Sequence, residues 1–201
     1  MLIMARQSKG KVKQLKNLLI VDGETEEAYF KNILQRYKLS AKDVKRVAPS
    51  GGDAVSSGIS EARNYELATQ KQYEKYYIII DRDYLSEKEF KNILDEVNQK
   101  TNVELIFSNV AFEVWLLAYY QRMTRRPVNA KTDNGLYKQE LAKHLKVNYK
   151  KGDSIQLDKI ISSAEHPIDT AYNNTSNIQD VNYNYQCTNV GPFLCNLVST
   201  R

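Results

Sequence analysis

Carboxylate side chains follow two of the most apolar runs of the sequence, and their spacing suits a divalent cation. Asp22 comes directly after the run NLLIV at 17–21, and Asp81 and Asp83 come after the run YYIII at 76–80. While the backbone stays extended, residues two apart project to the same side with Cα atoms about 7 Å apart. Mg²⁺ prefers a few carboxylates together with water and phosphate oxygens. These three aspartates are therefore the candidate metal ligands, with Mg²⁺ as the expected ion and Mn²⁺ as an alternative.

The elements that must position these acids are strands followed by helices. Apolar runs at 17–21, 44–48, 76–80 and 103–107 each precede a stretch whose apolar residues recur at helical spacing. Four such units in succession predict an α/β domain with a mainly parallel sheet flanked by helices, over residues 15–120. Ligand sites in such sheets form outside the carboxyl ends of the strands. We therefore expect one edge of the sheet to carry the three aspartates together with Ser108, Asn109 and Glu113.

Each of these polar residues also has an ordinary structural explanation. Asp-Gly after a strand is a common turn, and an Asp or Ser before a helix is a common cap. Glu113 can equally be a polar group on a helix otherwise filled by Phe112, Trp115 and Leu116. The interpretation as a metal site depends on their coincidence, because three separate strands deliver oxygen ligands to the same edge.

The chain changes character after residue 120, where strand-like runs disappear and tyrosine, asparagine and lysine become common. Helical spacing predicts helices at about 134–146, 154–172 and 190–199, and a loop at 172–186. Residues 121–201 are therefore predicted to form a basic helical extension packed on the sheet domain.

The net charge is +5, and the positive charge is concentrated in two places. Residues 5–16 contain several cations and no acid, and residues 121–151 contain many cations against Asp133 and Glu140 alone. Such clusters suit the phosphate backbone of a nucleic acid, although a solvated helix face with a flexible tail would give the same pattern. The candidate nucleic-acid-binding residues are Arg82, Arg122, Arg125, Arg126, Lys150 and Lys151.

Other classes of site are disfavoured by the composition. Cys187 and Cys195 form no CxxC pair, and His144 and His166 are scattered, so neither a zinc site nor a disulfide framework is indicated. The sequence has no apolar run long enough to cross a membrane and no apolar signal core near Met1. We therefore expect a cytoplasmic protein whose metal ligands are oxygens.

Three ordered segments resemble the RloB-like proteins, which have a Toprim-type catalytic core: LLIVDGETEEAYFKNIL, YYIIIDRDYL and LIFSNVAFEVWLLAYY. The segment CTNVGPFLCNLV is a weaker match to the ending Asn-Pro-Ser-Thr-x-Val of that family. A Toprim core holds Mg²⁺ with a glutamate after its first strand and an Asp-x-Asp after a later strand. Those positions correspond here to Asp22 and to Asp81 with Asp83, and Glu113 resembles the glutamate of the family's Ser-Asn-x-x-x-Glu-x-Trp motif.

The resemblance implies a Mg²⁺-dependent nuclease acting on DNA or RNA, including tRNA. It also implies that the nuclease is the effector of an anti-phage abortive-infection system, coupled to an ABC/AAA-type ATPase. Asp22 departs from the family pattern, because its carboxylate lies one methylene closer to the backbone than that of a glutamate. A misplacement of about 1 Å can lower a rate on the order of a hundredfold. Glu24 or Glu26 could compensate for the shorter side chain.

Two other functions remain open on the sequence. The departure at Asp22 fits a catalytically degenerate Toprim module that binds and regulates its ATPase partner. A primase-like or topoisomerase-like activity is a third possibility, but the chain lacks room for the additional domains of those enzymes.

Overall fold

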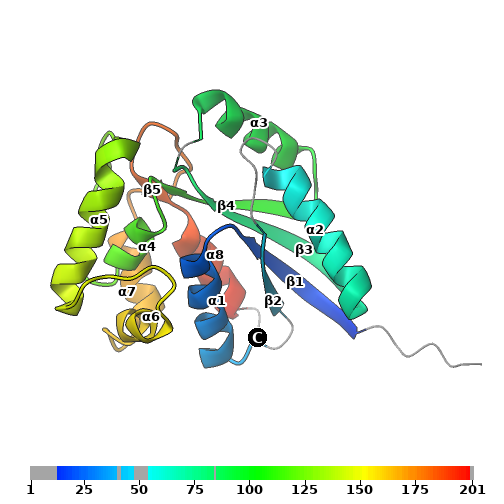
Figure 1. Ribbon diagram of the computed structural model, residues 1–201, viewed down its shortest axis with the longest axis horizontal. Coiled ribbons are helices and arrows are strands. Elements are labelled where there is room, and N and C mark those ends of the chain that lie inside the picture. The colour runs from blue at the N-terminus through cyan, green and yellow to red at the C-terminus, as the bar shows by residue number, and fades with distance from the viewer. Residues whose placement is uncertain (1–12, 40–41, 48–53, 84, 200–201) are drawn as a thin grey trace, which may run out of the picture.

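The computed structural model describes residues 13–39, 42–47, 54–83 and 85–199. Its centre is a five-stranded sheet in the order β2-β1-β3-β4-β5, with helices on both faces (Figure 1). The first four strands run parallel, and the short β5 pairs antiparallel with β4. The predicted α/β class with a mainly parallel sheet is confirmed.

The strands are β1 (Lys13–Val21), β2 (Lys42–Arg46), β3 (Lys71–Asp81), β4 (Val103–Asn109) and β5 (Cys187–Thr188). The helices are α1 (Glu24–Arg36), α2 (Ala54–Thr69), α3 (Glu87–Asn98), α4 (Glu113–Leu117), α5 (Ala130–Leu145), α6 (Ser154–Ile161), α7 (Pro167–Asn174) and α8 (Val190–Ser199).

Both faces of the sheet are buried, which explains why the strand sequences are apolar without alternation. Leu19 and Ile79 point to one face, where they pack with α1 and with the helices that follow β4. Leu18 and Ile78 point to the other face, which α2 and α3 cover. The helices after residue 120 share the first of these apolar clusters, so they pack directly against the sheet domain.

Two details of the prediction differ from the structure. The helix predicted at 154–172 is wrong, since α6 ends at Ile161 and α7 begins at Pro167. Proline cannot donate a hydrogen bond to a preceding helical turn, and its ring disfavours helical backbone at the residue before it. The strand β5 was not predicted, because two residues carry no periodic pattern; Ser108 and Asn109 of β4 supply its pairing partners.

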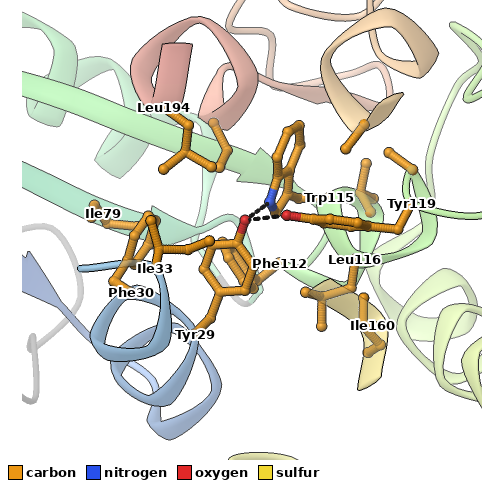
Figure 2. Close-up of a cluster of buried hydrophobic side chains, with 14 of the residues drawn as sticks. Tyr29, Phe30, Ile33, Ile79, Phe112, Trp115, Leu116, Tyr119, Ile160 and Leu194 are labelled. Atoms are coloured by element: carbon orange, nitrogen blue, oxygen red, sulfur yellow. Dashed lines mark hydrogen bonds between the residues drawn. The ribbon is translucent and has the colours of Figure 1, made fainter. Parts of the chain in front are cut away.

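A buried hydrogen-bonded trio joins α1 to α4 and to the turn that follows it (Figure 2). Trp115 Nε1 donates to the Tyr29 hydroxyl at 2.7 Å, and the hydroxyls of Tyr29 and Tyr119 lie 2.6 Å apart. The Tyr29 ring also meets Phe112 edge-on, at 5.2 Å between centroids. These contacts fix the spacing of α1 and α4, the two helices that begin at the candidate site.

We predict that Tyr29→Phe destabilises the protein. The substitution keeps the ring but leaves the buried Trp115 N–H without an acceptor, which should lower the free energy of unfolding by roughly 1–3 kcal/mol. Urea denaturation measures this change. Tyr185→Phe is the control, since Tyr185 is exposed; an equal loss in both variants would contradict the assignment.

Candidate metal centre

The carboxyl ends of β1, β3 and β4 lie level at one edge of the sheet. Val21 of β1 is in register with Ile79 of β3, and Asp81 of β3 with Ser108 of β4. The chain leaves β1 for β2 on one side and returns to β3 on the other, so this edge contains the switch point at which open α/β sheets bind ligands. Figure 1 shows β1 and β3 side by side at the middle of the sheet. Asp22 follows β1 and Asp81 ends β3, so they come from the two sides of that point.

Acidic side chains gather here in larger number than the sequence alone indicated. Three of them are nearly inaccessible: Asp81 is 7% exposed, Glu26 4% and Glu113 1%. Burial raises the pKa of Asp81 well above its usual value, and the neighbouring carboxylates raise it further. The carboxylates whose charges act on Asp81 are Glu26, Asp22, Glu113 and Asp83.

Asp22 and Glu26 show the same effect. Burial, followed by the charge of Asp83, raises the pKa of Asp22 to about 6. Burial, followed by the charge of Asp22, raises the pKa of Glu26 to about 8. Asp22, Glu26, Asp81, Asp83 and Glu113 are called the acid cluster below; burial and neighbouring carboxylates disfavour the charged forms of Asp22, Glu26 and Asp81.

Glu26 is the member of the acid cluster that sequence reasoning left undecided. It lies one helical turn after Asp22, and its carboxylate folds back over Gly23. A Cβ atom at Gly23 would lie 1.9 Å from Glu26 Oε2, so the glycine after Asp22 makes room for this carboxylate. Glu24, the other candidate, is exposed and packs along Gly152 instead. Only the three-dimensional packing distinguishes the two glutamates.

Asp83 reaches the acid cluster by a turn and not by extended backbone. β3 ends at Asp81, and Asp83 has a left-handed φ of 33°, which aspartate tolerates better than most residues. The turn is held by hydrogen bonds from Asp83 N to Val110 O at 3.1 Å and from Leu85 N to Arg82 O at 2.7 Å. The expectation that extended backbone sets the spacing of the Asp81 and Asp83 carboxylates is therefore wrong. Asn134 of α5 also donates to Asp83 Oδ1 at 3.2 Å.

Glu113, at the start of α4, has a buried carboxylate oxygen near the buried Tyr149 hydroxyl. Neither group makes a hydrogen bond of standard geometry with a described residue. The two side chains are nevertheless close enough to interact, since burial and then the charge of Glu113 raise the pKa of Tyr149. The Tyr149 hydroxyl could turn to donate to Glu113, and a bound cation would equally satisfy the carboxylate oxygen.

The loop between α5 and α6 brings a cation to the acid cluster. Gly152 N donates to Thr25 Oγ1 at 3.1 Å, and Gly152 has a left-handed φ of 68° with no room for a side chain against Glu24. This anchors the loop at the start of α1. Burial alone would lower the pKa of Lys151, but nearby carboxylates raise it overall: Glu113, Asp83, Asp81 and Glu26.

The sequence matches the family of RloB-like proteins over residues 18–197, from β1 to α8. The chain belongs to the RloB-like protein family. Neither a curated protein nor a solved structure matches it. In this RloB-like protein the matched range includes every member of the acid cluster and the α5–α6 loop. Among the described residues, no helix combines the length and apolar character that crossing a bilayer requires.

The acid cluster of this RloB-like protein has the right donor chemistry for a hard divalent cation, since every donor is a carboxylate oxygen. Within the described ranges, no three acidic, histidine or cysteine side chains already surround one point as metal ligands. Binding would therefore require the carboxylates to rotate toward a shared ion. Asp22, Asp81 and Asp83 would hold it, with Glu26 and Glu113 beside them.

The predicted nucleic-acid-binding residues of the RloB-like chain lie in different surroundings. Arg126 is paired with Asp133 through two hydrogen bonds of 3.2 and 3.1 Å, so its role is at least partly structural. Arg122 and Lys150 are exposed, and Arg125 is exposed with Asp180 at 3.9 Å. Lys151 is near enough to interact with the carboxylates of the acid cluster, and Arg82 lies between Asp81 and Asp83 in the chain with its guanidinium over Tyr183. Residues 5–12 of the basic run at 5–16 lie outside the described residues. For residues 13–16 the backbone is described but the side chains are not.

We predict that the metal-free protein loses stability as the pH rises. Asp22 and Glu26 bind their protons more tightly in the folded chain than in the unfolded chain, with pKa values of about 6 and about 8. They therefore favour folding most below about pH 4, and this contribution disappears as the pH rises to about 8. Urea denaturation in EDTA from about pH 5 to about pH 8.5 should show the free energy of unfolding falling.

Glu26→Gln should flatten this dependence, since the amide cannot ionise. Glu61→Gln on the exposed side of α2 is the matched control and should keep the wild-type slope. Parallel curves for wild type and Glu26→Gln would show that Glu26 does not carry the effect.

Proposed function

We propose that this RloB-like protein is a Mg²⁺-dependent nuclease that hydrolyses phosphodiester bonds of DNA or RNA. The observation that carries the proposal is the acid cluster: carboxylates that follow three strand ends at the switch point of a parallel sheet, with Glu26, Asp81 and Glu113 buried and with the pKa values of Asp22, Glu26 and Asp81 raised. A purely structural role would favour pairing or replacing such groups, because uncompensated buried charge is destabilising. A divalent cation would remove that penalty.

The residues of the chain divide into two roles under this proposal. Asp22, Asp81 and Asp83 hold the ion, which when bound would activate a water molecule and stabilise the charge on the phosphate and the leaving oxygen. Lys151 would hold a phosphate group against the site, since it is exposed on the anchored loop and near enough for the carboxylates to raise its pKa. Glu113 has an oxygen free to orient a water molecule.

The position of Glu26 favours an active nuclease over the alternative, which is a catalytically degenerate binding module. That alternative is motivated by the short side chain of Asp22. Glu26 places a longer carboxylate beside Asp22 from the next helical turn, close enough for the charge of Asp22 to act on it. Glu26 can therefore compensate for the side chain of Asp22, which is one methylene shorter than a glutamate.

The resemblance that runs through the three motifs extends the proposal to a biological setting. There the nuclease is the effector of an anti-phage defence system and acts together with an ABC/AAA-type ATPase subunit. Co-purification of the chain with an ATPase encoded by a neighbouring gene would support this setting, and failure of the two proteins to associate would count against it.

We predict that Asp81→Asn and Asp83→Asn each abolish metal-dependent cleavage. Both substitutions preserve the size of the side chain and remove a charged ligand, so the rate should fall at least about a hundredfold. The measurement is cleavage of labelled DNA and RNA with Mg²⁺ or Mn²⁺. Asp95→Asn, on an exposed position of α3, is the control. Wild-type cleavage by both cluster variants would refute the proposed site.

We predict opposite effects of Lys151→Ala on metal and on substrate. Loss of the ammonium removes a cation that repels the ion, so Mn²⁺ should bind more tightly in calorimetry. Loss of its contact with phosphate should raise KM about tenfold or more. The exposed neighbour Lys150→Ala is the matched control. Equal effects of the two substitutions would show that Lys151 acts only through the general positive charge of the surface and has no specific role at the site.

A further inference from the structure

A tightly held loop lies beside the acid cluster, formed by residues 182–185. Asn109, the fully buried last residue of β4, donates its Nδ2 hydrogens toward three carbonyl oxygens of this loop. The distances are 3.0 Å to Asn182, 2.7 Å to Tyr183 and 2.9 Å to Tyr185. The Asn182 side chain also accepts from the backbone N–H groups of residues 184 and 185. The loop is therefore fixed at the carboxyl edge of the sheet.

Two tyrosines of this loop each meet an arginine, but in different surroundings. Tyr183 lies under Arg82, at 4.0 Å from guanidinium carbon to ring centroid. Its hydroxyl donates to Leu85 O at 2.7 Å and its ring packs on Phe90. Tyr183 thus serves to join the loop to the turn that carries Asp81 and Asp83. These packing contacts are enough to explain why a tyrosine occupies position 183.

Tyr185 has no comparable structural role. It is 40% exposed, with Arg125 at 5.2 Å from its ring centroid. A short antiparallel pairing presents both side chains: Gln186 N donates to Arg126 O at 2.8 Å, and Val128 N donates to Asn184 O at 3.2 Å. The acidic neighbour of Arg125 is the almost fully exposed Asp180 at 3.9 Å, a weak surface pair. An aromatic face and a cation therefore stand together on a rigid support.

We propose that Tyr185 and Arg125 form a stacking platform for an unpaired nucleobase, so that single-stranded nucleic acid is the substrate class. Aromatic and guanidinium faces stack on bases of any sequence, whereas the bases of a duplex are already stacked on one another. The loop that carries Tyr185 also carries Tyr183, whose ring lies under Arg82 in the turn between Asp81 and Asp83. A strand stacked on Tyr185 would therefore lie at the edge of the sheet that carries the carboxylates. The inference rests on the proposed function for its choice of nucleic acid.

The test measures binding without cleavage. Fluorescence anisotropy in EDTA compares wild type with Tyr185→Ala on a labelled, unstructured single strand of DNA or RNA and on the corresponding duplex. Loss of one stacked base should weaken single-strand binding about tenfold and duplex binding by less than about twofold. Tyr185→Phe should retain wild-type affinity, because the ring face remains. Ile155→Ala is the control, since Ile155 is an exposed apolar residue on α6.

The outcomes separate this inference from the proposed nuclease activity. Equal losses on single strand and duplex, or wild-type binding by Tyr185→Ala, would overturn the platform even if the protein cleaves nucleic acid with Mg²⁺. A selective loss of single-strand binding, in a protein that cleaves nothing, would support the platform and refute the nuclease. With active enzyme, Tyr185→Ala should raise KM more than it lowers kcat, and Arg125→Ala should act in the same direction.

Discussion

Mutual repulsion among buried carboxylates is the constraint around which this structure is arranged. Asp22, Glu26 and Asp81 lie together where burial disfavours their charged forms; the charge of Asp22 also raises the pKa of Glu26, and the charges of both raise the pKa of Asp81. Packing elsewhere must offset this cost, as is common where proteins keep strained or destabilising groups at functional sites. Here the offset comes from a sheet buried on both faces and from the apolar cluster that holds α1 against α4.

The carboxylates of the acid cluster can stay together only because α1 and α4, which carry two of them, are joined by buried contacts farther along the two helices. Tyr29 lies one turn beyond Glu26 on α1, and Trp115 lies two residues beyond Glu113. Their hydrogen bond, with the Tyr119 hydroxyl beside it (Figure 2), holds the two helix starts at a set distance. The polar atoms of the trio are hydrogen-bonded to one another in apolar surroundings. The trio can therefore keep α1 and α4 together against the repulsion between the carboxylates that they carry.

The sequence was sufficient for the parts of this site that depend on strand ends. Apolar runs mark β1, β3 and β4, and parallel topology then requires Asp22, Asp81 and Glu113 to meet at one edge. It was insufficient where the outcome depends on packing between distant segments. Glu26 is distinguished from Glu24 by the space above Gly23, and Lys151 enters through the loop that Thr25 anchors. Neither contact leaves a periodic signal, and the turn at Asp83 depends on a hydrogen bond to Val110 across the neighbouring strand end.

Lys151 is a cation whose charge reaches the acid cluster, and it bears on the proposed function. Nearby carboxylates raise the pKa of Lys151, and Lys151 in turn acts to lower the pKa values of Asp22 and Glu26. Under the proposed function, a divalent ion alone would relieve the repulsion between the acids but would repel Lys151. A phosphate bound together with the ion could face the metal on one side and Lys151 on the other. Binding of ion and phosphate together would then be favoured over binding of either one alone, as a metal-dependent phosphodiesterase would require.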